Sequence, residues 1–417
     1  MGTAGAEEQQ RVVRHLLTGC EECRAYIAAQ LQSPYRSHRR AEAEAQLSGV
    51  VERSTERVLD LIDSPHSGDL VKELFQETLP RRELLALNKS RYRTVGVCEA
   101  LIERALELRF VDARTARDAA KLALDIALRL DRPRLPELGA QARAIYGNAL
   151  RLTGDLRSAE EQLSLALAEV EEADSPSLRA QVLSFVASLR FDQRLFAESV
   201  RLARQAAGIW ADLGKRGEFA LTLVQAGISE GERGRPNAAI RLLVEASSLA
   251  GENRRLALHI THNTIRFAND AGNGDLALAL LAEARPLYDA VAEPLFYLKR
   301  DWLEGQILAA QGHLEAAAVR LGSTLGEFVR RENPFEAALV ALELAEVASR
   351  LGRLDDVRRL ASQSYRYLKA AKVDREALAA TMLLRAADNA EAARLAIREV
   401  ISVLRRPLPV RAARPLT

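Results

Sequence analysis

The sequence predicts an all-helical protein, built as an α-solenoid from repeated helix pairs. Its 417 residues are 48% hydrophobic and 28% charged but only 5% aromatic. Ala, Leu, Arg and Glu dominate, and these residues favour helices. Short turns between apolar helical runs recur 40 residues apart in five of six intervals and 38 apart in the other, and a fixed period of about 20–50 residues indicates a repeat architecture. The turns are Asp112-Ala113-Arg114, Gly154-Asp155, Gln193-Arg194, Gly234-Arg235, Gly274-Asp275, Gly312-His313 and Gly352-Arg353.

The first 40 residues carry the sharpest local motif. His15 precedes the pair Cys20 and Cys23, which are three residues apart. Thiolate and imidazole are the ligands that zinc prefers, in a tetrahedral set of four. We therefore predict a zinc site in a small helical head, residues 1–40. The fourth ligand is left open among His38, Glu7, Glu8 and water.

This motif resembles the zinc-binding N-terminal domain of anti-sigma factors, in which a histidine precedes C-x-x-C. Here four residues separate His15 from Cys20, where the family has three, and no cysteine lies upstream of Cys20. The resemblance implies bound zinc and a sigma factor as partner. Two alternatives remain: a vestigial head in which the cysteines are small buried residues, and a redox dithiol.

Residues 41–94 are predicted to form a helical connector. Apolar positions between 41 and 62 have helical spacing. A second short helix is expected over 70–79 and ends before Pro80, and an apolar patch follows at 84–87. The start of the repeat array is placed near Tyr92.

The array is expected to span residues 95–404 in about seven to eight helix pairs. Around Gly154, small residues occupy fixed positions at Gly147, Ala159 and Ala166. Small residues at a helix crossing let the two backbones approach. The same positions in other units hold Gly227, Ala239, Ala246, Gly305, Ala317, Ala187, Ala206, Ala279 and Ala345.

This pattern resembles tetratricopeptide repeats, whose helix pairs stack into a right-handed superhelix. The stretches 80–85, 92–94 and 98–104 also resemble bacterial tetratricopeptide proteins that open with a short regulatory head. The last unit, near 375–404, is expected to cap the stack. Residues 405–417 are expected to form a basic, proline-rich disordered tail.

In such repeats, positions two, five, nine and twelve of each first helix line the concave face. A polar groove of this kind suits an extended peptide or a helix. His259 and His262 are interpreted as surface or groove polarity, and Trp210 and Trp302 as packing residues. The predicted peptide-binding residues are Asn148, Arg151, Gln181, Ser184, Ser188, Thr261, Thr264, Lys299, Trp302, Gln306, Glu346 and Ser349.

The remaining features argue against an enzyme. No phosphate loop, G-x-S-x-G or H-E-x-x-H motif is present. A net charge of +2 does not predict nucleic-acid or membrane binding. Three cysteines, no signal peptide and no long apolar run predict a cytoplasmic protein.

We therefore expect a non-enzymatic, regulatory protein-interaction scaffold. The groove would bind a peptide or helix, and the head would hold zinc and a sigma factor or another signalling partner. The alternatives are a peptide-responsive transcriptional regulator and a plain adaptor whose zinc site is vestigial.

Overall fold

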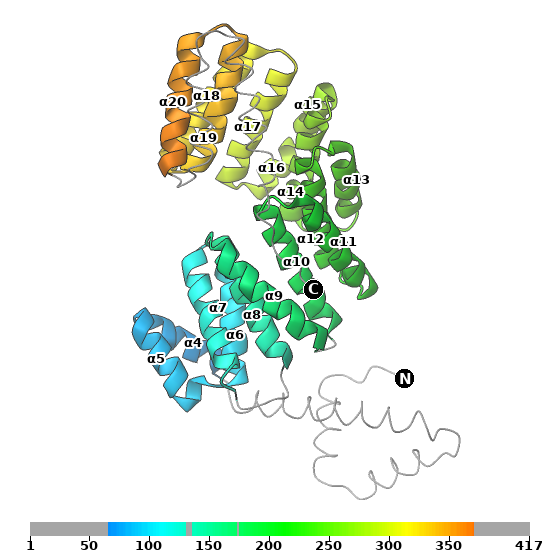
Figure 1. Cartoon of the computed structure of the whole chain (residues 1–417). Coiled ribbons are helices and arrows are strands. Elements are labelled where there is room, and N and C mark those ends of the chain that lie inside the picture. Colours follow the sequence, from blue (N-terminus) through cyan, green and yellow to red (C-terminus); the bar gives the residue numbers. More distant parts are fainter. Residues whose placement is uncertain (1–65, 131–135, 173–174, 371–417) are drawn as a thin grey trace, which may run out of the picture.

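The computed structural model describes residues 66–130, 136–172 and 175–370 (Figure 1). The predicted zinc head, residues 41–65 of the connector, the predicted last repeat and the tail lie outside these residues. Every regular element within the described ranges is a helix. The prediction of an all-α solenoid is confirmed. Among the described residues, no helix combines the length and apolar character needed to cross a membrane.

Within the described residues, seven helix pairs stack side by side along an elongated molecule (Figure 1). Each pair packs a first helix against a second, and the next pair packs on both. The pairs are α6 (Val95–Leu108) with α7 (Ala113–Ala127), α8 (Pro136–Leu152) with α9 (Leu156–Glu172), α10 (Pro176–Asp192) with α11 (Phe196–Asp212), α12 (Arg216–Glu232) with α13 (Pro236–Ser247), α14 (Arg254–Asp270) with α15 (Gly274–Glu283) and α16 (Arg285–Val291), α17 (Pro294–Ala310) with α18 (Leu314–Arg330), and α19 (Pro334–Arg350) with α20 (Leu354–Ala370).

The 40-residue period follows from helix length. Helices α10, α11 and α12 have 17 residues each, and three-residue turns separate them at 193–195 and 213–215. Two helices and two turns thus occupy 40 residues. Helix α13 has only 12 residues, and 248–253 link it to α14, so α12 and α14 begin 38 residues apart.

The structure corrects the predicted turn at Gly274-Asp275. A left-handed residue marks the equivalent turn of each unit from Gly154 to Gly352, and in the fifth unit this residue is Gly272, with φ +82°. Gly274 is instead the first residue of α15. The short interval therefore falls before this turn and not after it. Accordingly Ala277 is fully buried at the helix crossing, whereas the predicted Ala279 is exposed.

Close helix crossings explain the small residues of the pattern. A Cβ atom at Gly147 would lie 2.8 Å from Cγ of Leu163, and one at Gly305 would lie 2.7 Å from Cδ2 of Leu321. Both leucines are 1% exposed. Glycine at these positions lets the second helix of each pair place a leucine directly against the first helix.

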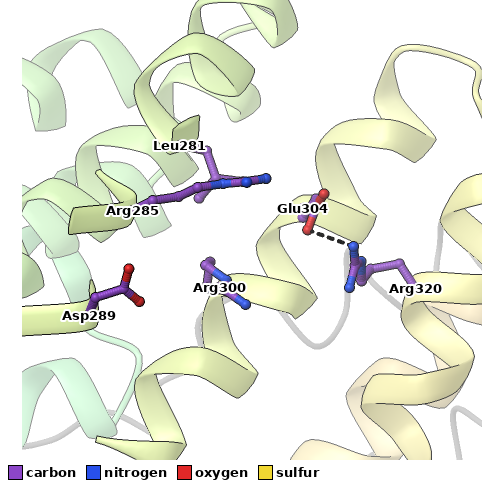
Figure 2. A pocket seen from close by; sticks show the side chains of 6 residues that line it. All are labelled: Leu281, Arg285, Asp289, Arg300, Glu304 and Arg320. Atoms are coloured by element: carbon purple, nitrogen blue, oxygen red, sulfur yellow. Dashed lines mark ion pairs between the residues drawn. The ribbon is translucent and has the colours of Figure 1, made fainter. Parts of the chain in front are cut away.

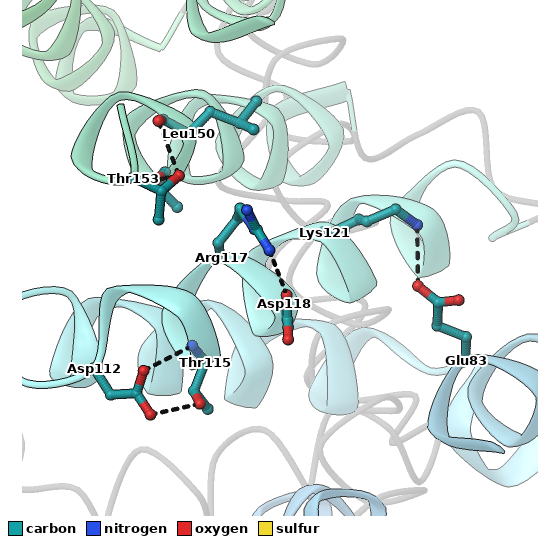
Figure 3. A network of polar contacts seen from close by, with 9 residues as sticks. Glu83, Asp112, Thr115, Arg117, Asp118, Lys121, Leu150 and Thr153 are labelled. Carbon is teal, nitrogen blue, oxygen red and sulfur yellow. Dashed lines mark hydrogen bonds and ion pairs between the residues drawn. The ribbon is translucent and has the colours of Figure 1, made fainter. Parts of the chain in front are cut away.

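The described part of the connector packs on the array as two further helices. These are α4 (Ser67–Gln76) and α5 (Leu79–Asn88), followed by the 3₁₀ turn η1 (Ser90–Tyr92). Pro80 does not stop a helix as predicted; it lies in the first turn of α5, where a missing N–H costs nothing. Tyr92 is fully buried and shares a core with Leu74 and Leu101. Lys121 of α7 also contacts Glu83 of α5 at 3.4 Å (Figure 3).

Candidate functional site

Positions two, five, nine and twelve of each first helix, which the sequence analysis assigned to a groove, are called the row here. The row continues from the first helix of one pair to the first helix of the next. Because the turn of the fifth pair lies at Gly272 and not at Gly274, the row positions on α14 shift two residues toward the N-terminus. His259, His262 and Arg266 on α14 thereby replace Thr261 and Thr264 at these positions. The Thr264 hydroxyl donates to the Ile260 carbonyl at 3.0 Å and is satisfied within its own helix. The two histidines are therefore part of the row.

Polar side chains on α8 and α10 are largely engaged with one another. Arg151 donates to Oδ1 of the buried Asn148 at 3.0 Å and reaches Asp192 of the next unit at 2.6 Å. The hydroxyls of Ser184 and Ser188 donate to carbonyls one turn earlier in α10, at 2.8 and 3.0 Å. Gln181 is half-buried. This part of the row is pre-organised, and few of its donors are free.

The row on α12 is apolar. Leu221 has 56% of its surface exposed, although it is a large hydrophobic residue, and Ile228 is half-buried. Val224 between them is buried. An exposed leucine at a groove position offers a contact for an apolar side chain of a ligand.

The row on α14 and α17 is cationic. Nδ1 of His262 lies 2.8 Å from the Tyr288 hydroxyl. Burial, then the nearby cations Arg266 and Lys299, lower the pKa of His262 to about 3, so the ring is neutral at pH 7. His259 is an exposed residue, yet desolvation by the surrounding protein and then Lys299 lower its pKa as well. Arg266 pairs with Glu232, whereas Lys299 forms no ion pair within the described residues.

An acidic residue of α19, Glu343, which the sequence analysis did not single out, connects the rows of α17 and α19. Trp302 Nε1 donates to one carboxylate oxygen of Glu343 at 2.5 Å, and Gln306 donates to the other at 2.8 Å. The Trp302 ring meets Phe328 edge-on, with centroids 5.6 Å apart. Glu343 lies 41 residues after Trp302 and 37 residues after Gln306. These spacings are close to the 40-residue period, which is the sequence signal that could have predicted the contact. Trp302 is half-buried. One part of its ring packs on the hydrophobic core through Phe328, in agreement with its interpretation as a packing residue.

The last predicted groove residues lie on α19. Glu346 is half-buried and Ser349 is 5% exposed. The row therefore passes from polar, through apolar and cationic, to acidic along the stack.

The described residues offer no metal centre. No group of three or more His, Cys, Asp or Glu side chains within them could hold a metal ion. Cys98 is buried and its thiol donates to the Ala123 carbonyl at 3.3 Å. His15, Cys20 and Cys23, the predicted zinc ligands, lie outside the described residues.

Comparisons with known proteins identify the fold. No protein-family model matches the sequence, and no curated protein matches it. Among solved structures, a Rap protein complexed with Competence and Sporulation Factor aligns with a TM-score of 0.60 at 12% identity, covering 74% of this chain and 86% of its own. The apo form of RapI aligns with a TM-score of 0.55 at 12% identity, covering 66% and 99%.

A third structure, aspartyl phosphate phosphatase F from Bacillus subtilis, aligns over 99% of this chain and 98% of its own, with a TM-score of 0.51 at 13% identity. At such low identity these likenesses show a shared fold. The prediction of tetratricopeptide-like helix pairs is confirmed, and the chain is a tetratricopeptide-like solenoid.

Proposed function

We propose that this chain is a non-enzymatic regulatory scaffold that binds a peptide or a helix along the first helices of its array. The observation that carries the proposal is the row on α12, α14 and α17. There an exposed leucine, Leu221 of α12, and an ammonium group without an ion pair in the described residues, Lys299 of α17, share the row with Trp302, whose ring is held by Glu343. Free apolar and charged groups on a rigid framework suit a ligand that supplies both.

The chemistry of the row indicates the ligand. Lys299, with His259 and Arg266 on the adjacent helix, favours an acidic side chain or a terminal carboxylate. Leu221 and Ile228, one unit earlier, favour an apolar side chain. We therefore expect a peptide that combines an apolar residue with an acidic group a few residues away.

The solved structures support this proposal by analogy. One neighbour is a Rap protein in complex with Competence and Sporulation Factor. Another, with a TM-score of 0.50 at 11% identity, is the Rap conjugation gene regulator of plasmid pLS20 in complex with the Phr* peptide. Both names describe a complex with a bound factor or peptide on a similar solenoid, and the second names a gene regulator.

The test uses the full chain and its own fluorescence. Trp210→Phe leaves Trp302 as the sole tryptophan, because the sequence contains two. Short peptides selected by display on the full chain are then titrated while Trp302 emission is followed. We expect a saturable change that Lys299→Gln weakens about tenfold, the loss of one charge-assisted contact.

The matched control is Lys215→Gln, at an exposed lysine in the turn before α12. It should leave the affinity unchanged. The proposal fails if no selected peptide perturbs Trp302, or if both lysine variants weaken binding equally.

The non-enzymatic part of the proposal has its own test, because one structural neighbour is named a phosphatase. The full chain should release no phosphate from acetyl phosphate or from a phosphorylated response regulator above the buffer rate. Turnover that survives repeated purification would make the chain an enzyme.

For the head, we propose a zinc site at His15, Cys20 and Cys23 that docks a sigma factor or another signalling protein. The support is the ligand chemistry of the motif. Purified protein should contain about one zinc per chain, and Cys20→Ser with Cys23→Ser should abolish both zinc and capture of the sigma factor. Zinc-free protein with unchanged partner binding would favour the plain adaptor with a vestigial head.

The peptide-responsive transcriptional regulator is the remaining alternative. It requires DNA binding by the full chain that weakens with added salt. An electrophoretic shift at low salt, relieved by a groove peptide, would favour it over the scaffold.

A further inference from the structure

A polar pocket of about 270 Å³ lies between the second helix of the fifth pair and the sixth pair (Figure 2). Its lining comes from four helices: Leu281 of α15, Arg285 and Asp289 of α16, Arg300 and Glu304 of α17, and Arg320 of α18. Arg300 and Glu304 lie on a different face of α17 from Lys299 and Trp302. The pocket is therefore separate from the groove.

A break in the second helix shapes this pocket. Helix α15 ends at Glu283 and α16 begins at Arg285, with Pro286 in its first turn. Proline has no N–H and its ring clashes with the carbonyl four residues earlier, so a continuous helix is disfavoured here. The break places Arg285 and Asp289 around the buried Leu281 and opposite α17 (Figure 2).

Two of the three arginines that line the pocket already have a carboxylate partner. Arg320 pairs with Glu304 at 3.2 Å. Arg300 is fixed by Asp301, to which its Nε and Nη2 donate at 3.0 and 2.8 Å, and its guanidinium lies 5.2 Å from the Tyr297 ring. Fixed guanidinium groups lose little entropy when they bind an anion.

The third arginine has no such partner. Asp289 accepts a hydrogen bond from the Tyr297 hydroxyl at 3.2 Å, and Arg285 makes no hydrogen bond or ion pair within the described residues. Arg320 is paired with Glu304 and Arg300 with Asp301, so Arg285 is the one guanidinium of the lining that has no carboxylate partner within the described residues. Arg285 extends into the pocket above Arg300 (Figure 2).

We infer that this pocket binds a single carboxylate group, taken by the planar fork of Arg285 and faced by Arg300. A guanidinium matches a carboxylate with two parallel hydrogen bonds. A single negative charge matches this one unpaired guanidinium, whereas a dianion such as phosphate would meet the repulsion of Asp289 and Glu304. The carboxylate could belong to a small carboxylic acid or to a glutamate side chain of a protein.

Ligand-observed NMR on the full chain tests this site with three probes. Butyrate represents a small acid, N-acetyl-glutamate methylamide represents a protein side chain, and N-acetyl-glutamine methylamide is the neutral control. We expect saturable binding of at least one acid, none of the neutral amide, and weaker binding as salt is added. Binding of butyrate alone identifies a small acid, and binding of the glutamate derivative alone identifies a protein side chain.

Variants locate the binding. Arg285→Gln should weaken it about tenfold or more, and Arg285→Lys should restore it only in part, because an ammonium lacks the fork. Arg330→Gln is the matched control, since this arginine lies on α18 with 74% of its side chain exposed and pairs with Glu327 outside the pocket. Lys299→Gln, in the groove, should have no effect.

The inference is overturned if neither acid binds saturably, if inorganic phosphate binds more tightly than both acids, or if Arg285→Gln, folded by circular dichroism, binds as the wild type does.

Discussion

Replacing Gly231 by alanine should destabilise the array, although alanine is the better helix former. A Cβ atom at Gly231 of α12 would lie 2.0 and 2.1 Å from two ring atoms of Phe267 on α14. The Phe267 ring is fully buried, so it has little room to move. Overpacking a core costs up to about 3 kcal/mol, and the gain in helix propensity returns about 1 kcal/mol. We expect a net loss of about 2 kcal/mol.

The assay is thermal and urea unfolding of the full chain, followed by circular dichroism. For a chain of 417 residues, a loss of this size lowers the midpoint by about 2 °C. Gly326→Ala in α18 is the matched control: it is also within a helix, but its Cβ would meet nothing within 4 Å. This change should raise stability by about 0.5–1 kcal/mol, so the two substitutions should have opposite signs.

A second variant checks the cause. Phe267→Leu should cost less in the Gly231→Ala background than in the wild type, because it removes the clash. The same contact fixes the distance between two first helices, so Gly231→Ala should also weaken peptide binding in the groove. Equal or greater stability of Gly231→Ala would refute this packing account.

Three further predictions concern single residues. Arg194 has φ +60° at the turn where other units have glycine, and a side chain is strained in this left-handed conformation. Arg194→Gly should therefore stabilise the chain by about 1 kcal/mol in urea unfolding. Gly154→Ala should destabilise it by a similar amount. The pKa of His262 is about 3 in the fold, well below its ordinary value of 6.5; unfolding therefore takes up a proton between these pH values, and stability falls as pH drops through this window. His262→Gln should make this fall shallower, and an unchanged slope would exclude His262 as its source. Burial raises the pKa of the Cys98 thiol to about 12; in a Cys20→Ser, Cys23→Ser background it should resist iodoacetamide at pH 8 until urea unfolds the chain, and rapid labelling of folded protein would contradict this.

Much of the fold could be predicted because its determinants are local and repeated. The glycines at 147, 227 and 305 recur with the period, and each one marks a helix crossing against a leucine. The fifth unit was predicted two residues out of register because both Gly272 and Gly274 can occupy a turn. Only the backbone reveals that Gly272 is the left-handed residue and that α13 is short.

The candidate groove was harder to predict, because its features depend on neighbouring units. The shift at Gly272 moved His259 and His262 into the row and moved two threonines out. Glu343 has no local motif, and its role depends on Trp302 and Gln306 of the preceding unit. Similarly, Pro80 was predicted to stop a helix because proline disfavours helix interiors, yet its position in the first turn of α5 is one that proline favours.

Hydrogen exchange on the full chain with a selected peptide tests the central proposal most directly. The account predicts that the peptide protects amides in the first helices α12, α14 and α17, and leaves the second helices α13, α15 and α18 unchanged. Protection confined to the second helices, or none at saturating peptide, would contradict a groove on the first helices.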